Sequence, residues 1–86
     1  MYTQHALDRM NQRGISSSVI DLVIDWGRCF VSHGKDVYFI PKKMIKKLRA
    51  RGLLTVAPER VEGIYVVVGE GEVITVAHKI SRKFRV

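Results

Sequence analysis

Length, composition and charge limit this chain to one small, basic domain. Its 86 residues carry a net charge of +7 and can enclose a single core, and a chain of this size buries only about 60% of the surface that its unfolded form exposes. The 47% hydrophobic content argues against disorder, and no apolar run approaches the roughly 18 residues that a membrane span needs. We therefore predict one soluble domain over residues 1–86, with no membrane association.

The first residues and the cysteine content indicate the compartment. Met1 to His5 shows no basic start followed by an apolar segment, so nothing marks the chain for export. The single cysteine, Cys29, excludes an internal disulfide, and we expect it to be a small core residue and not a nucleophile. These features predict a cytoplasmic protein.

The first predicted helix lies within residues 2–15. His5, Arg9 and Arg13 recur at intervals of four, so they project from neighbouring turns of one side. Apolar residues fall on the other side, and Gly14 can supply the positive φ that commonly ends a helix. A histidine can move a proton near neutral pH and an arginine can hold a phosphate, so this side suits phosphodiester chemistry, although an ordinary solvated helix face has the same spacing.

A second helix and a first hairpin follow. Serines at 16–18 offer N-cap hydroxyls, and the strongly apolar helix after them ends at Gly27. Residues 28–32 and 37–40 are rich in β-forming side chains, and the segment between them includes the glycine that a tight turn favours. We predict a hairpin with His33 exposed near its tip.

A third helix and a second hairpin complete the pattern. Pro41 suits the first position of a helix that stops at Gly52, and outside a narrow apolar stripe this helix is almost wholly cationic. The segment 53–58 can extend a helix or form a short extended piece. Residues 63–68 and 72–77 flank a Gly-Glu-Gly loop and predict a hairpin whose two strands are central in the sheet.

The order of these elements, α-α-β-β-α-β-β, predicts an α+β fold. It would combine two N-terminal helices, an antiparallel sheet of about four strands in two hairpins, and one inserted basic helix. Residues 80–86 follow as a basic tail, and the pattern leaves open whether this tail is ordered or mobile. We expect the tyrosines on the strands to pack against neighbouring side chains and not to stack on nucleic-acid bases.

Cationic residues cluster in two blocks that contain no acid. Such clusters build a local positive field that suits a nucleic acid or an acidic partner protein, although a small domain can also carry surface charge for solubility. We favour nucleic acid, and RNA in particular, as the partner. The blocks are Lys42, Lys43, Lys46, Lys47, Arg49 and Arg51 in the third helix, and Lys79, Arg82, Lys83 and Arg85 near the C-terminus.

The opening motif supports a family resemblance. The pattern His5-x-x-x-Arg9-Met10-x-x-Arg13-Gly14-Ile15-Ser16, with Gly27, the first hairpin and the strand at 73–76, resembles the bacterial family called domain of unknown function 4258. The resemblance covers roughly residues 3–79. Members of that family look like compact relatives of the RelE, ParE and BrnT toxin folds, in which paired helices pack on an antiparallel sheet and the ribonuclease members cut RNA without a metal. The resemblance therefore implies a toxin-like, RNA-directed protein.

The histidines and arginines are compatible with a metal-independent ribonuclease. His78 ends the last strand on the face of that strand's core residues and would emerge at the rim of the sheet. If the first helix packs over that face, His5 and His78 can meet beside Arg9. One imidazole would take the 2′-hydroxyl proton of RNA and the other would protonate the leaving oxygen, with Arg9 or Arg13 on the phosphate. We take His5, Arg9, Arg13 and His78 as candidate catalytic residues, with a strand-capping role for His78 as the alternative.

We predict no cofactor and no metal site. The three histidines lack the close spacing of zinc motifs, and the Gly-Glu-Gly loop leads into no helix that could bind a phosphate. Two functions without catalysis stay open. The chain can be a nucleic-acid-binding module, or it can be an interaction module that binds an acidic protein or forms a homodimer.

Overall fold

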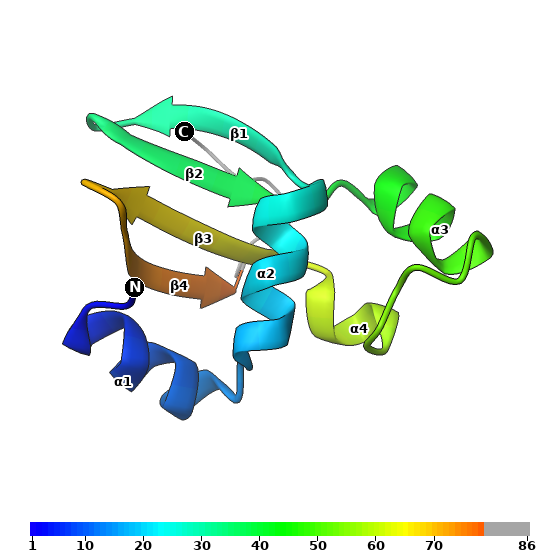
Figure 1. Cartoon of the computed structure of the whole chain (residues 1–86), viewed down its shortest axis with the longest axis horizontal. Helices are drawn as coiled ribbons and strands as arrows, with labels where there is room; N and C mark the ends of the chain where they lie inside the picture. Colours follow the sequence, from blue (N-terminus) through cyan, green and yellow to red (C-terminus); the bar gives the residue numbers. More distant parts are fainter. Residues whose placement is uncertain (79–86) are drawn as a thin grey trace.

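Four helices and a four-stranded antiparallel sheet make up residues 1–78, the part of the chain that the computed structural model describes (Figure 1). The predicted α+β fold and its order α-α-β-β-α-β-β are confirmed, and one short helix, α4, adds to them. None of the helices within residues 1–78 is long and apolar enough to cross a membrane. The helices are α1 (Gln4–Arg13), α2 (Ser17–Trp26), α3 (Lys42–Ala50) and α4 (Pro58–Val61), and the strands are β1 (Arg28–Ser32), β2 (Lys35–Phe39), β3 (Ile64–Gly69) and β4 (Glu72–His78).

Both predicted hairpins form, and each closes with a two-residue turn. His33 and Gly34 join β1 to β2 with φ values of 53° and 76°, and Glu70 and Gly71 join β3 to β4 with 51° and 79°. A positive φ at both central residues is the turn geometry that matches the twist of the flanking strands. The turn therefore fixes the register of the first hairpin, whereas the pairing of β3 with β4 shifts by one residue between Val67 and Val68. His33 is exposed at the tip of the first hairpin, as predicted.

The sheet is a simple meander in the order β1-β2-β3-β4. The prediction that both strands of the second hairpin are central is therefore wrong for β4, which lies at an edge. Its apolar composition has another cause, because the N-terminal segment pairs with the start of this strand. The Thr3 N–H donates to the Val73 carbonyl at 3.0 Å, and the Val73 N–H donates to the Met1 carbonyl at 2.8 Å.

Helices α1 and α2 cover one face of the sheet. Helix α2 lies over β2 and β3, and α1 packs along β4 (Figure 1). Tyr38, Val66 and Val76 are paired across β2, β3 and β4, so their side chains share this face. Ala6 of α1 and Val23 of α2 are fully buried against it, which makes this layer the core of the domain.

The environment of Cys29 differs from the prediction, and the environment of Gly27 explains why a glycine stands at that position. Cys29 is exposed, so the expectation of a core cysteine is wrong. The reason is that β1 is an edge strand, whereas α2 lies mainly over β2 and β3. Gly27, in contrast, permits a close approach, because a Cβ there would lie 2.2 Å from the Val23 carbonyl oxygen and 2.6 Å from that of Phe39.

Thr3 connects the first helix to the sheet through its hydroxyl. Its Oγ1 accepts a hydrogen bond from the Ala6 N–H at 3.1 Å, which caps α1, and donates to the Ile74 carbonyl at 2.8 Å. Both bonds are partly buried. One side chain therefore satisfies an otherwise unpaired helix amide and fixes where α1 begins relative to β4.

Replacing this threonine by its isostere should destabilise the fold. Thr3→Val removes both hydroxyl bonds and keeps the shape, so we expect a loss of about 2 kcal/mol in the free energy of unfolding. Urea unfolding followed by circular dichroism measures it. Ser16→Ala is the matched control, because Ser16 makes only a cap bond of 3.4 Å to the Val19 N–H and should cost about 1 kcal/mol or less. Equal losses in the two variants would contradict the connecting role of Thr3.

Candidate functional site

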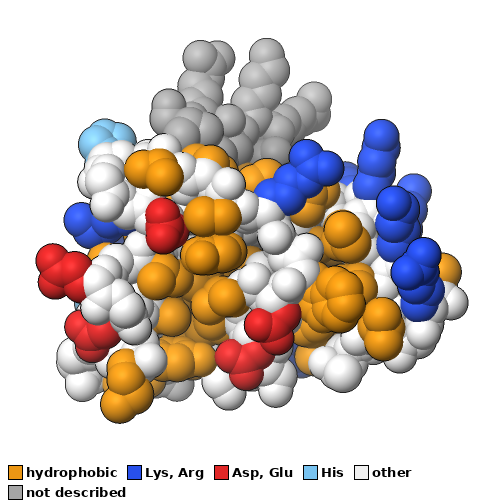
Figure 2. Space-filling model, turned by 45° about the horizontal axis from the view of Figure 1, so that its top comes forward, with side chains coloured by type: hydrophobic (Ala, Val, Ile, Leu, Met, Phe, Trp, Pro, Cys, Tyr) orange, Lys and Arg blue, Asp and Glu red, His pale blue; other side chains and the backbone are white. Residues whose placement is uncertain are grey.

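Helix α3 carries the first basic block at one end of the molecule (Figure 1). Ile45 and Leu48 are buried and attach the helix to the rest of the domain, whereas its lysines and arginines are exposed. Figure 2 shows most of the Lys and Arg side chains of that face gathered on one side, beside exposed hydrophobic atoms, with the Asp and Glu side chains elsewhere. On the face that Figure 2 shows, most basic side chains are therefore separated from the acidic ones.

The helix is not charged in the way that would stabilise it best. Its first turn contains Lys42 and Lys43 and no acidic residue, although the N-terminus of a helix favours negative charge. Pro41, its N-cap, makes no side-chain capping bond. Lysines in the first turn cost helix stability, so the presence of Lys42 and Lys43 favours a role outside folding, whereas Lys47 and Arg49 in the last turn suit the dipole.

The cations of α3 form two rows. We name Lys42, Lys46 and Arg49 the inner row, because these residues line a pocket between α3 and α4. Lys43 and Lys47, each one position further along the helix and so about 100° around it from the inner row, form the outer row, and both are exposed. Arg51, just after the helix, is exposed as well.

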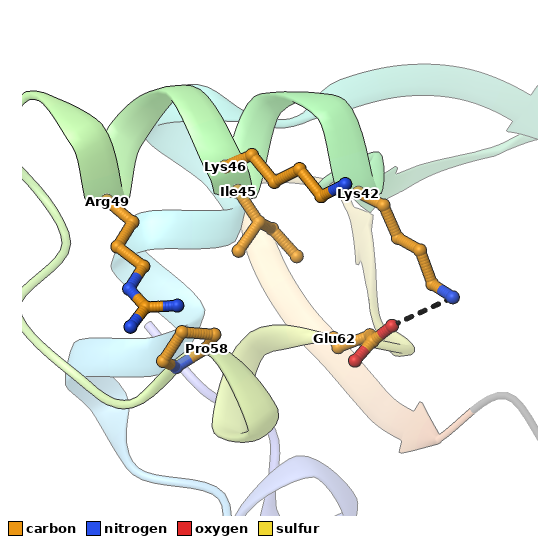
Figure 3. A pocket seen from close by; sticks show the side chains of 6 residues that line it. All are labelled: Lys42, Ile45, Lys46, Arg49, Pro58 and Glu62. Carbon is orange, nitrogen blue, oxygen red and sulfur yellow. Dashed lines mark ion pairs between the residues drawn. The ribbon is translucent and has the colours of Figure 1, made fainter.

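The pocket between α3 and α4 has a volume of about 180 Å³ (Figure 3). Figure 3 shows Arg49 extending toward Pro58 of α4 and Lys42 extending toward Glu62, with Ile45 between them. Lys42 Nζ lies 3.2 Å from Glu62 Oε2. Among the described residues, no acidic group forms an ion pair with Lys46 or Arg49.

The sequence pattern does not predict this pocket, because the segment 53–58 is compatible with both a helix and an extended chain. The missing element is α4, which supplies Pro58 to one wall and ends just before Glu62. Its signal is present in the sequence. Pro58 followed by Glu59 places a proline and an acid in a first turn, which is a common helix start.

The four candidate catalytic residues lie on α1 and β4. His5 is exposed in the first turn of α1, Arg9 is half-buried, and Arg13 is exposed at the helix end. His78 is half-buried at the end of β4. It pairs with Ile64, which is in the core, so His78 emerges on the face that the helices cover.

The structure does not bring the two imidazoles together. Helix α1 begins beside Val73 and Ile74 through the bonds of Thr3, and it runs in the same direction as β4 (Figure 1). His78 comes four residues after Ile74, which corresponds to about 13 Å along an extended strand. His5 therefore lies near the start of β4, and the Arg13 end of α1 is the one directed toward the His78 end.

The aromatic side chains of the strands pack within the domain. Tyr65 is only 8% exposed, and its ring centroid lies 5.8 Å from that of Phe39. Burial raises the pKa of the Tyr65 hydroxyl above its usual value. The prediction of packing is confirmed for this tyrosine, which is not available to stack on a base.

Two parts of the predicted interface are not located here. The second basic block, Lys79, Arg82, Lys83 and Arg85, lies outside the described residues, as does the predicted tail at 80–86.

Within residues 1–78, no three His, Cys, Asp or Glu side chains come close enough to hold a metal ion.

Comparisons with protein-family models, curated proteins and solved structures find no match for this chain. The resemblance to the domain of unknown function 4258 family therefore rests on the sequence motif alone.

The exposed ion pair of the pocket should contribute little to stability. The side chains of Lys42 and Glu62 are 79% and 47% exposed, so solvent screens their attraction. In a double-mutant cycle of Lys42→Gln, Glu62→Gln and the double variant, we expect a coupling energy of about 0.2–1 kcal/mol that disappears in high salt. Urea unfolding at low and high salt measures it. A larger coupling that salt does not reduce would show that the pair is structural.

Proposed function

We propose that this protein binds nucleic acid, with RNA favoured, through the cationic surface of α3. The observation that carries the proposal is the exposure of both cation rows on a helix whose first turn is charged against its own dipole. Phosphate contacts would use that charge, because neutralised phosphates release counterions and so favour binding.

The arrangement of charge supports a long anionic partner. Residues three and four apart on a helix lie about 5–6 Å from one another, so each row presents a short line of positive charge that a phosphate backbone can follow. On the face in Figure 2 most basic side chains lie apart from the acidic ones, and this separation steers a polyanion toward α3, where Glu62 is the acid in contact with Lys42. RNA is favoured over DNA because of the sequence resemblance to toxin-like folds.

Binding should depend on α3 and on salt. With a short single-stranded RNA, Lys43→Gln/Lys47→Gln should weaken binding and reduce the slope of log affinity against log salt by roughly 0.7 for each lost phosphate contact, or about 1.4 for the pair. Fluorescence anisotropy over a salt series measures both quantities. We choose the outer row because it lies outside the pocket.

Lys35→Gln is the matched control for this experiment, compared with Lys43→Gln alone. It removes one charge from an exposed position beside the β1–β2 turn, at the end of the hairpin opposite the segment that leads into α3. This control should keep most of the affinity. Salt-independent binding, or an equal loss in Lys35→Gln and Lys43→Gln, would exclude α3 as the interface.

A second candidate function is metal-independent cleavage of the bound RNA. It is favoured by the packing of α1 along β4, which directs the arginine-bearing end of α1 toward the end of the strand that carries His78. In this version Arg9 and Arg13 would hold the phosphate, and His78 would take the 2′-hydroxyl proton and deliver it to the leaving 5′ oxygen. His5, near the other end of β4, would contribute less.

Cleavage should be tested in the presence of a chelator. If the protein cuts RNA, His78→Ala and Arg9→Ala should each slow cleavage by about 100-fold or more, whereas His5→Ala should have a smaller effect. Gel analysis of an end-labelled RNA gives the rates, and anisotropy shows whether each variant still binds. No cleavage under any condition, or equal rates in all variants, would remove the enzyme from consideration and leave the binding function.

A further inference from the structure

We propose that the pocket between α3 and α4 holds a single nucleotide unit, whose phosphate lies on the inner row and whose base or sugar lies on the pocket floor. The proposal rests on the function proposed above and names what one part of that surface recognises. A free nucleoside monophosphate and one unit of a single-stranded RNA share this chemistry.

The floor and walls of the pocket are suited to an apolar group. Ile45 is 6% exposed at its base, and the half-buried ring of Pro58 forms part of the opposite wall. The inner row contributes its aliphatic stems to the lining, because long cationic side chains can bury their methylene groups while their charged ends stay in water. The apolar face of a base or a ribose can therefore be buried here, because Ile45 and Pro58 present no polar side-chain atom that would lose a hydrogen bond to water.

The size of the pocket limits how much of a ligand it can enclose. Its volume of about 180 Å³ is below the range of roughly 300–1000 Å³ that is usual for sites that enclose a small molecule. One ring or one sugar can enter, and the rest of the ligand must stay at the rim. The rim is where the charged ends of the inner row lie.

Two cations of the inner row remain available for a phosphate. No acidic group among the described residues forms an ion pair with Lys46 or Arg49. The planar guanidinium of Arg49 can bind two phosphate oxygens at once, and its flat face can also stack on a base. Lys46, one turn earlier, lines the same pocket and adds a second positive charge, with its side chain directed toward Lys42 in Figure 3.

Glu62 would make the pocket prefer a nucleotide over a simple anion. This carboxylate lines the pocket, where it would repel a bare phosphate, and its contact with Lys42 only partly offsets its charge. Its oxygens can accept hydrogen bonds from the amino or hydroxyl groups of a nucleoside. A pocket with two free cations, an apolar floor and one acceptor matches a ligand that has a phosphate, a ring and donors.

The test is a titration of the full chain with adenosine and uridine 5′-monophosphates, with inorganic phosphate at the same concentrations as the reference. In ¹⁵N-resolved NMR spectra we expect at least one of the nucleotides to shift the amide signals of Ile45, Arg49 and Glu62. Phosphate alone should shift them much less. No response of these signals to either nucleotide, or an equal response to phosphate, would overturn the inference.

Three variants sharpen this titration. Lys46→Gln/Arg49→Gln should lower nucleotide affinity by about tenfold or more, because charge-assisted bonds to the phosphate are lost. Lys43→Gln/Lys47→Gln should weaken binding of RNA and leave the nucleotide response in place. Glu62→Leu should weaken the nucleotide, because the acceptor is lost, and strengthen phosphate, because the repulsive charge is removed. Full nucleotide affinity in Lys46→Gln/Arg49→Gln would count against the site, as would parallel changes for both ligands in Glu62→Leu.

The two proposals fail separately. If RNA binds through α3 and the nucleotides give no pocket response, only the single-nucleotide site is excluded. If the nucleotides bind in the pocket and RNA does not bind, the site stands and the proposed function is wrong.

Discussion

The pairing of β2 with β3 is the constraint on which the rest of this structure depends. Each hairpin alone would be only marginally stable, and the register Val37 to Val67 and Tyr38 to Val66 joins them into one sheet. The same pairing holds both ends of the segment 40–63 at one end of the sheet. Helices α3 and α4 must therefore leave and return at the same place, which is why they meet and enclose a pocket.

Packing, and not local preference, keeps the basic helix in place. A nine-residue helix is too short to be stable alone in water, and α3 has neither a capping side chain nor an acid in its first turn. Burial of Ile45 and Leu48 compensates for both defects. Because packing depends on Ile45 and Leu48, folding does not constrain the exposed positions of the helix. The side chains at those positions can therefore be suited to a binding partner. Helix α4 lies beside one flank of α3 and forms the pocket with it, whereas the other flank lies outside the pocket.

Local signals predicted most of the fold, and non-local contacts account for what was missed. Gly34 and Gly71 mark the two turns directly, and the order of the elements followed from them. The edge position of β4 could not be read from its apolar residues, because the segment that pairs with it lies some seventy positions earlier in the chain. The same contrast between local and non-local signals holds for the candidate site. The cations of α3 were evident from composition, whereas the distance between His5 and His78 depends on the direction in which α1 runs along β4. The acceptor Glu62 joins the site only through the fold of α4.

The exposed thiol on β1 has a practical consequence for work in solution. Cys29 is the only cysteine of the chain and lies on an edge strand, so two copies can be joined through it by air oxidation. A dimer observed without reductant would then be a covalent product and not evidence for a physiological homodimer. Under reducing conditions, a fluorescent dye can be attached to the same thiol. This thiol lies at the opposite edge of the sheet from β4, the strand that carries His78. Labelling there would require no substitution in either proposed interface.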